Sequence, residues 1–514
     1  MPDMLVEVVL VLVAVAVYFT YWIKYTYSFF EKYNIQYDKP IPIVGSMGEV
    51  VFGQKNMFDK LQDLYNQFNF GVAGIFEMKT PVFLIRNPEL VNQMMVKDFE
   101  HFVNHRTCFT GDYDGLLVDS LVSLTDQKWR DMRATLTPGY TGSKLKAMFE
   151  FMRETAKEST LSLKEEMRDG RTDIDLGEYF MGYANDVIAT TAFGFKINSM
   201  KVKDNHFFKM GKSVLGNFGP LVVLKFCLLT NFTKVARFFR ISILSRKTHL
   251  YFMRLVIGAM KQRFEQKIFR PDMINLLMEA RGMDVQGNQS SSCSQKWSDT
   301  EIAAQCFFFF LSGFDSVSTL LCFISHELME NQSIQEKLRD EIKGVLEELN
   351  GNQLTYEILN SMKYMDCVVS EALRKWPPNS MTDRVCTKSI EIQDPETGER
   401  IELTPGDKVW FPIVGIHRDP KNFVDPFKFD PERFNEENKG NINPNTFIPF
   451  GAGPRMCIAH RFAVMEIKVM VFYMFSEIQV KMSEKSCVPM KLDPATCLTF
   501  PKNGFWVKLL DSKK

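Results

Sequence analysis

A glycine-rich turn with a single cysteine constrains the fold of this chain more than any other segment. It spans Pro449–Ala463, reads PFGAGPRMCIAHRFA, and precedes a helical pattern that continues to Phe475. Cys457 therefore lies at a helix start, where free backbone N–H groups and the helix dipole favour a thiolate and lower its pKa. Gly451 and Gly453 permit unusual φ angles and a close approach of the backbone to the sulfur or to a flat ligand.

Two charged motifs precede this turn. Glu371 and Arg374 lie three residues apart on a predicted helix that ends at Trp376, so their side chains share one face. A buried pair of this kind needs a third partner, and the sequence PERF at 431–434 offers Arg433. Each motif alone is common on charged helices, whereas their order, followed by the cysteine turn, is specific.

Together these segments resemble the signature of the cytochromes P-450. The run Phe450-x-x-Gly453-x-Arg455-x-Cys457-x-Ala459 is similar to the haem-binding loop of that family. Ala459 replaces the commoner glycine, a small-for-small change that we expect to be tolerated. The resemblance extends from the N-terminal segment to the C-terminus, and it implies a haem cofactor whose iron is ligated axially by the Cys457 thiolate.

The resemblance also assigns residues to the haem propionates. Trp129 and Arg133 in WRDMR are similar to the family's WxxxR, and Arg384 lies where many members place another propionate partner. Arg455, two residues before the cysteine, is expected to neutralise a carboxylate of the same ligand. Two loop residues are secondary candidates for this role: His105 and Arg106.

An acid and several small polar residues interrupt an apolar helical segment, Phe307–Ser316. Gly313 weakens the helix and Ser312 can bond back to a carbonyl, so we expect a local bulge that makes room for dioxygen. Asp315 and Ser316 resemble the family's acid–alcohol pair, which relays protons, and they are the predicted catalytic residues. Serine replaces the usual Thr at 316 and the usual Ala or Gly at 312. Because serine lacks the methyl group that restricts χ1, we expect looser coupling of electron use to product.

The remaining sequence predicts a mainly α body with a minor β-sheet region. Apolar residues recur at helical spacing in four segments: Phe149–Met167, Asp299–Leu328, Ile334–Leu349 and Tyr356–Trp376. Strand patterns occur in three others: Gly71–Ile85 with a break at Lys79–Pro81, Ser389–Ile401 and Leu498–Leu509. The polar stretch Arg281–Lys296 predicts a surface loop. Since no internal repeat or second linker is present, we expect a single large domain with the cytochrome P-450 fold.

An apolar segment lies ahead of this body. From Leu5 to Ile23 only Glu7 and Thr20 are polar. At 1.5 Å per residue the segment spans roughly 28 Å, close to the ~30 Å of a bilayer's hydrocarbon core. Acidic residues precede it and lysines follow it, which is unlike a cleavable signal peptide and places the following domain in the cytosol. We therefore expect a single-pass anchor in the endoplasmic reticulum membrane.

The expected domains are a membrane anchor at 1–24, a proline-rich linker at 25–45 and a catalytic domain at 46–514. Alternating prolines in KPIPIVG at 39–45 predict a stiff extended strap. Three sequons are expected to carry no sugar because the domain faces the cytosol: Asn231, Asn288 and Asn331.

Composition and missing motifs argue against other classes. Sixty-two basic residues balance 62 acidic ones, which disfavours a nucleic-acid binder. Ten cysteines show no CxxC pair, so we expect nine reduced, buried thiols and no disulfide framework or zinc site. Gly451–Gly453 lacks the third glycine of a dinucleotide loop, His326 lacks the second histidine of a zinc protease, and no GxSxG or GK[ST] motif occurs.

The resemblance implies a monooxygenase that uses dioxygen and NADPH-derived electrons. No flavin or nicotinamide site occurs, so electrons come from a partner, which in the family is NADPH–cytochrome P-450 reductase, sometimes helped by cytochrome b5. Residues 126–148 are most similar to insect microsomal members of families nine and six, relatives of vertebrate family three, which favours detoxification of plant toxins or insecticides. Two alternatives remain: a same-fold peroxide isomerase that needs no reductase, and a non-enzymatic haem or lipid carrier.

The predicted pocket suits a small lipophilic substrate because its segments carry few charges: 108–124, 217–229, 307–316, 379–382 and 496–500. Leu221–Leu229 contains only Lys225 as a charge. Leu224 and Leu228 would share one helix face. We expect this segment to dip into the membrane surface beside the anchor.

Overall fold

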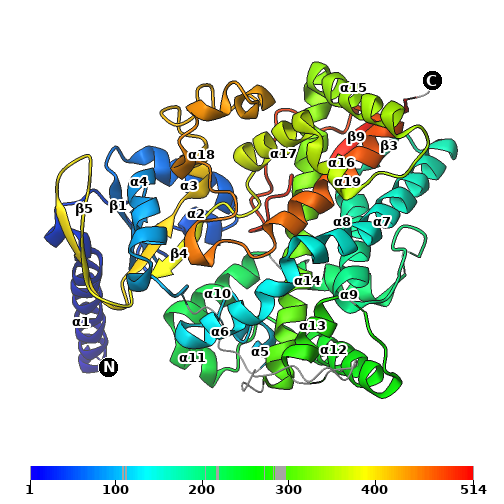
Figure 1. Cartoon of the computed structure of the whole chain (residues 1–514). Helices are drawn as coiled ribbons and strands as arrows, with labels where there is room; N and C mark the ends of the chain where they lie inside the picture. The colour runs from blue at the N-terminus through cyan, green and yellow to red at the C-terminus, as the bar shows by residue number, and fades with distance from the viewer. Residues whose placement is uncertain are drawn as a thin grey trace.

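The computed structural model describes residues 2–106, 109, 113–202, 204–215, 219–270, 272–281, 283 and 297–512. Helices dominate the molecule (Figure 1). The longer helices are α1 Pro2–Tyr27, α3 Met57–Gln67, α6 Asp126–Leu136, α7 Gly142–Arg168, α8 Leu176–Ile188, α9 His206–Leu215, α10 Pro220–Asn231, α12 Arg246–Gln266, α14 Asp299–Glu330, α15 Gln332–Leu349, α17 Lys363–Lys375 and α19 His460–Glu477. The shorter helices are α2 Gly48–Val51, α4 Pro88–Asn92, α5 Gly115–Val118, α11 Thr233–Phe238, α13 Met273–Ala280, α16 Tyr356–Ser361 and α18 Ile413–His417.

The strands form small sheets. One has the order β1–β2–β7–β4, in which only β2 and β7 are parallel; its strands are β1 Val72–Glu77, β2 Thr80–Ile85, β4 Thr382–Val385 and β7 Lys408–Phe411. A second has the order β3–β9–β8, with β3 Asp173–Asp175, β8 Ile478–Lys481 and β9 Trp506–Asp511. The third is the antiparallel pair β5 Ile390–Gln393 and β6 Arg400–Leu403. The predicted mainly helical body with a minor sheet is confirmed.

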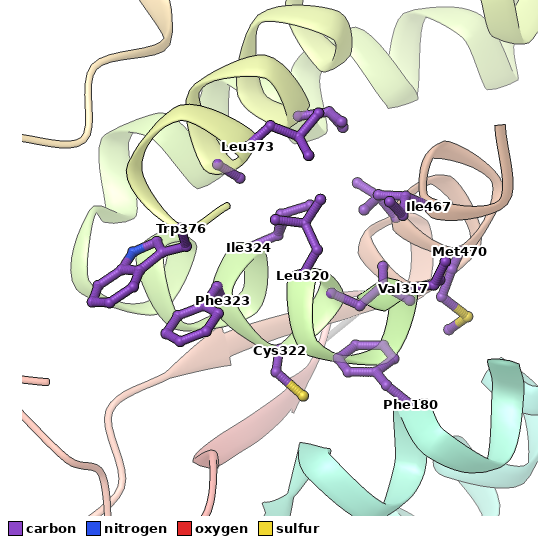
Figure 2. Close-up of a cluster of buried hydrophobic side chains, with 14 of the residues drawn as sticks. Phe180, Val317, Leu320, Cys322, Phe323, Ile324, Leu373, Trp376, Ile467 and Met470 are labelled. Carbon is purple, nitrogen blue, oxygen red and sulfur yellow. The ribbon is translucent and has the colours of Figure 1, made fainter. Parts of the chain in front are cut away.

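The core is built around α14. Ser298 and Glu301 form a capping box that fixes its start. Apolar residues surround the helix on most sides, so it is buried among its neighbours. Figure 2 shows side chains of α14 packed between α8, α17 and α19. The rings of Phe323 and Trp376 stack there with centroids 4.3 Å apart. This packing holds α14 against α19, the helix that follows the cysteine turn.

Most predicted elements exist with shifted ends, but one predicted helix is wrong. The segment Tyr356–Trp376 forms α16 and α17, separated at Met362 by an extended backbone. The carboxylate of Glu341 in α15 accepts the N–H groups of Tyr364 and Met365 and so caps the second helix. The local periodicity contains no trace of this tertiary contact, which explains the error. The predicted loop 281–296 lies almost entirely outside the described residues.

The expected extended strap at 39–45 is also wrong, because the chain reverses there. Ile41 and Gly45 exchange backbone hydrogen bonds of 3.1 and 2.8 Å. Gly45 has φ +75° and Ile43 φ +73°, and the N–H of Ile43 donates to the hydroxyl of Tyr27. Prolines fix their own φ but leave these neighbours free, so a glycine and one strained residue suffice to close the turn.

Two helices are long and apolar enough to cross a membrane, and their burial separates them. In Met4–Tyr33, which contains α1, none of the apolar window is buried, whereas 61% of the window of α14 is buried. Figure 1 shows α1 projecting from the body with the N-terminus at its free end. The exposed α1 fits the predicted anchor, and α14 is the core helix.

The expectation of nine buried thiols needs correction, since Cys487 and Cys497 are only half-buried.

Candidate active site

The cysteine turn has the backbone geometry that its glycines predict. Gly451 has φ +74° and Gly453 φ +68°. A Cβ on Gly453 would lie 2.0 Å from the carbonyl oxygen of Met95, so only glycine fits. The N–H of Cys457 donates to the carbonyl of Phe450 at 2.9 Å. These contacts fix the position of the half-buried sulfur directly before α19.

The surroundings of the Cys457 sulfur correct one prediction. Burial raises the pKa of the Cys457 thiol, and the N–H of Ala459 and the charge of Arg133 only partly oppose this effect. The helix start therefore lowers the pKa less than burial raises it, and a bound metal ion would favour the thiolate further. Ala459 itself has φ −97°, which any L-residue adopts, so the replacement of glycine is tolerated as expected.

Arg455 stabilises the cysteine turn through contacts with α6 and with segments that precede α6. Its guanidinium donates to the carbonyls of Val103 at 2.9 Å and Leu124 at 2.7 Å. It also lies 4.0 Å from the ring centroid of Trp129, a cation–π contact. The predicted pair of Trp129 and Arg133 therefore lies next to the cysteine turn, and Arg133 donates to the carbonyl of Met456 at 2.8 Å.

The guanidinium groups of three residues lie near the cysteine turn with little negative charge to balance them: Arg133, Arg384 and Arg455. Arg384 is 1% exposed, and its Nε has no hydrogen-bond partner among the described residues. Burial, together with the charges of Arg384 and Arg133, lowers the pKa of Arg455 to about 9. Burial also lowers the pKa of Arg384 to about 10. An under-neutralised cluster with an unused buried donor fits an anionic ligand, and the two propionates of haem match this chemistry.

The two secondary candidates differ. His105 joins the cluster: its ring lies 3.3 Å from Nη1 of Arg384 and 3.2 Å from a carboxylate oxygen of Asp383. Burial and the charge of Arg384 lower the pKa of His105, so its imidazole is neutral. Arg106 is paired with Glu77 at 2.5 Å, and its backbone N–H donates to Asp383. His105 is thus placed with the predicted propionate residues, while the charge of Arg106 is already balanced.

A buried network of hydrogen bonds connects α17 to the segment that precedes the cysteine turn. Glu371 and Arg374 form a bidentate pair at 2.7 and 2.8 Å, and Arg433 lies 3.5 Å from Glu371, which confirms the predicted third partner. Arg374 donates to the carbonyl of His417. The Nε2 of His417 accepts the N–H of Ile448 at 3.0 Å, and its Nδ1 lies 3.1 Å from the carbonyl of Arg374.

His417 is a positioning residue that sequence reasoning missed. Burial and the charge of Arg374 lower the pKa of His417 to about 3, so the ring is neutral and Nδ1 carries its proton. Only this tautomer can donate to Arg374 and accept from Ile448 together. The local sequence shows one histidine at the end of an apolar run, a pattern typical of any core histidine.

One face of α14 is more exposed than the rest of the helix. Ser312 is exposed, and Phe309, Gly313 and Ser316 are half-buried, although the helix runs through the core. These positions recur at helical spacing. The ring of Phe309 lies 5.2 Å from that of Phe462 in α19, so this end of the face lies against the helix that follows the cysteine turn.

Ser312 bonds back to a helix carbonyl as predicted, but the expected bulge is absent. Ser312 donates to the carbonyl of Phe308 at 2.8 Å, and Ser316 donates to that of Ser312 at 2.7 Å. α14 is nevertheless α-helical without interruption. Gly313 serves close packing instead, since a Cβ there would lie 2.8 Å from the side chain of Ile188 in α8. The serines bond to carbonyls without displacing the helical ladder.

Asp315 is chemically unusual. It is the only acidic or basic residue between Glu301 and His326, and its Oδ1 is buried with no hydrogen-bond partner among the described residues. Burial raises the pKa of Asp315 to about 7. A carboxyl group with this pKa can give and take a proton near neutral pH.

Comparison with known proteins gives the family. The Cytochrome P450 family model matches residues 35–509. The chain is 42% identical to probable cytochrome P450 9f2 of Drosophila melanogaster over 96% of this chain and 97% of that protein. It is 38% identical to cytochrome P450 9e2 of Blattella germanica over 94% of each chain. It is also 31% identical to cytochrome P450 3A18 of Rattus norvegicus over 96% of this chain and 95% of that protein. The predicted resemblance to insect family nine and vertebrate family three is confirmed, and the chain belongs to the cytochrome P450 family as a haem-thiolate monooxygenase.

Proposed function

We propose that this enzyme oxidises small lipophilic xenobiotics, such as plant toxins and insecticides, with Asp315 and Ser316 as its proton relay. Haem held by a cysteine thiolate supplies the oxygen-activating chemistry. The observation that carries the proposal is the α14 face, where an unpartnered carboxyl group of near-neutral pKa interrupts a long apolar stretch. Such a surface suits apolar substrates and offers one proton source for the activation of dioxygen.

The remaining site residues hold the cofactor. Cys457 is the proposed iron ligand, and Phe450 and Gly453 shape its turn. The guanidiniums of Arg133, Arg384 and Arg455, with Trp129 and His105 beside them, bind the propionates: Trp129 braces Arg455, and the free Nε of Arg384 provides a donor. These residues would hold the cofactor through its propionates and its iron, and the apolar α14 face would remain for substrate.

The redox partner and the location are part of the same proposal. Members of the family work with redox partners, and here we assign NADPH–cytochrome P450 reductase on the endoplasmic reticulum membrane, with cytochrome b5 as a possible helper. The anchor is 1–24, the linker 25–45, and the catalytic domain 46–514 faces the cytosol. Two sequon side chains, Asn231 and Asn331, are engaged in hydrogen bonds to Thr80 and Glu327, in keeping with unglycosylated sites; Asn288 lies outside the described residues.

A second membrane contact is proposed at α10 and α11. Leu221 is 68% exposed and Leu224 44% exposed, and Phe238 and Phe239 are also exposed. In Figure 1 both helices lie on the lower side, toward which the free end of α1 points. Deleting residues 2–24 should leave measurable affinity for vesicles, and adding Leu224→Asp and Leu228→Asp should abolish it. Complete loss of vesicle binding after the deletion alone would contradict this second contact.

Product analysis of a reconstituted system tests the function. The full-length protein is combined with NADPH–cytochrome P450 reductase and a panel of lipophilic compounds, and products are identified by mass spectrometry. NADPH-dependent gain of one oxygen atom is expected. Rearrangement of a lipid hydroperoxide without NADPH would favour the isomerase alternative. Haem binding without turnover of any compound would favour a carrier.

A further inference from the structure

An open groove lies where α1 meets the body of the molecule. Its walls come from the end of α1, from the turn Phe29–Tyr33, and from the connection between β1 and β2. Tyr25, Lys32 and Lys79 are among the residues that line it. The junction is visible in Figure 1, where the upper end of α1 reaches the body beside β1.

The walls are held in place by buried contacts. The hydroxyl of Tyr27 donates to the carbonyl of Met78 at 3.3 Å, and the Tyr27 ring lies 5.0 Å from that of Phe76. Phe30 is fully buried against Gly74, where a Cβ would lie 2.5 Å from the Phe30 ring. The groove therefore keeps its shape because the residues around it belong to the core.

Two ammonium groups in the groove are placed by aromatic rings. Nζ of Lys32 lies 4.4 Å from the ring centroid of Phe29, and Nζ of Lys79 lies 4.8 Å from that of Phe232. Within the part of the chain that the structure describes, neither forms an ion pair with a carboxylate. Glu31, next to Lys32, accepts a hydrogen bond from Tyr37 instead. The groove thus presents two positive charges that lack an anion.

The groove also lies at a defined depth if α1 spans the bilayer. The apolar run ends at Ile23, and Tyr18, Tyr21 and Tyr25 are exposed around its end, as in the aromatic belt at a membrane interface. The headgroup layer is about 5–8 Å thick on each side of the hydrocarbon core. At 1.5 Å per residue, Tyr25 and Tyr27 lie about 3–6 Å beyond Ile23 and thus in this layer, and the turn Phe29–Tyr33 follows directly where α1 ends.

We infer that the groove binds the headgroup of one anionic phospholipid. The ammonium groups of Lys32 and Lys79 donate to its phosphate oxygens, and Phe29 and Pro81 contact the glycerol end of the acyl chains. The lipid would bridge α1 to the β1–β2 connection and so fix the angle of the catalytic body on the membrane. This inference rests on the proposed membrane anchor.

Lipid retention measures the site directly. Full-length protein is inserted into dioleoyl phosphatidylcholine nanodiscs with a minor fraction of dioleoyl phosphatidylserine, and the lipids that stay bound on release are counted by native mass spectrometry. One phosphatidylserine should be retained in preference to phosphatidylcholine. Lys32→Gln and Lys79→Gln should each lower this preference about tenfold, as expected for a lost charge-assisted hydrogen bond. Excess inorganic phosphate should not displace the lipid, because it lacks acyl chains.

Lys39→Gln is the matched control. Lys39 is exposed on the neighbouring segment but does not line the groove, so its loss should leave the preference unchanged. An equal fall for Lys39→Gln would mean diffuse attraction and overturn the site, as would displacement by phosphate. Insertion of the parent without any preference would overturn the groove alone. Failure to insert into nanodiscs would overturn the anchor and the groove together.

Discussion

The Glu371–Arg374–His417 network behind the cysteine turn and the Asp315 region of α14 differ in how their buried polar groups are paired. Around the cysteine turn, the Glu371–Arg374 pair and His417 are linked by hydrogen bonds that end on the backbone. On the α14 side, Oδ1 of Asp315 and Oγ1 of Thr319 are buried without hydrogen-bond partners among the described residues. A satisfied network is rigid and costly to break, whereas an unsatisfied group is free to exchange protons. This difference fits the proposal that one side holds the cofactor and the other supplies the proton relay.

The largest expected effect lies on the cysteine side. Cys457→His should abolish the thiolate-specific ferrous–CO spectrum completely even if haem stays bound, because imidazole does not donate electron density to iron as a thiolate does. The spectrum of purified protein checks this. Cys487→Ser, which removes another half-buried thiol, should leave the spectrum intact. An unchanged spectrum in Cys457→His would refute the ligand assignment.

Asp315→Asn tests the α14 side. Product formation should fall by ~10²–10⁴-fold, the usual worth of a positioned proton donor, while haem content and substrate binding stay near those of the parent. The pH profile of the parent should bend near pH 7 because the pKa of Asp315 is raised to about 7. The variant should lack this bend. Product formation equal to that of the parent would remove Asp315 from the relay.

The effect of Asp315→Asn on stability is also expected to depend on pH. An unfolded Asp has a pKa of about 4, so the raised folded pKa means that the folded state loses stability as the pH rises from about 4 through 7. Asn cannot ionise. The Tm of Asp315→Asn should therefore equal that of the parent at low pH and exceed it progressively toward pH 8. A gap that shrinks with rising pH would contradict the buried, unpartnered carboxyl group.

Variants of His417 test the hydrogen-bond network on the cysteine side. His417→Phe leaves the N–H of Ile448 and the carbonyl of Arg374 unpaired, and each buried unpaired group costs about 1–3 kcal/mol. The free energy of unfolding and the haem content should both fall. His417→Gln and His417→Asn each carry an amide with one acceptor and one donor group, but neither spans both ring-nitrogen positions of His417, so both should lie between Phe and the parent. Urea unfolding of apo and holo protein checks the order.

The pH dependence gives a second readout for His417. Its folded pKa is lowered to about 3 from an ordinary value of about 6.5. Its contribution to stability is therefore complete above pH 6.5 and is lost as the pH falls toward 3. His417→Phe should show a weaker decline of Tm between about pH 7 and pH 5 than the parent. Parallel declines would mean that His417 is not held neutral in the folded protein.

This contrast also explains what the sequence could predict. Periodicity located α14, α15 and the β1–β2 pair, and residue spacing located the Glu371–Arg374 pair. The roles of Cys457 and Asp315, which also came from residue spacing, stay predictions. Errors arose where tertiary contacts decide the outcome. Glu341 caps a helix that begins 22 residues later in the chain, at Lys363, and Ile188 explains a glycine that local rules attribute to a bulge. His417 and the pairing of Arg106 with Glu77 depend on partners far apart in the sequence, so no local pattern reveals them.

We propose that the cysteine side holds the cofactor and that the α14 side relays protons. The most direct test of this separation is the ratio of hydrogen peroxide released to product formed in Ser316 variants. Ser316 donates to the carbonyl of Ser312, and its loose χ1 is expected to let the parent release some peroxide. NADPH, peroxide and product are quantified in one reconstituted reaction, with haem content measured alongside. Ser316→Ala should raise the ratio at unchanged haem content, and Ser316→Thr should leave it equal or lower. If Ser316→Ala couples as well as the parent, or loses haem as His417→Phe is expected to, the proposed division between a side that holds the cofactor and a side that relays protons is wrong.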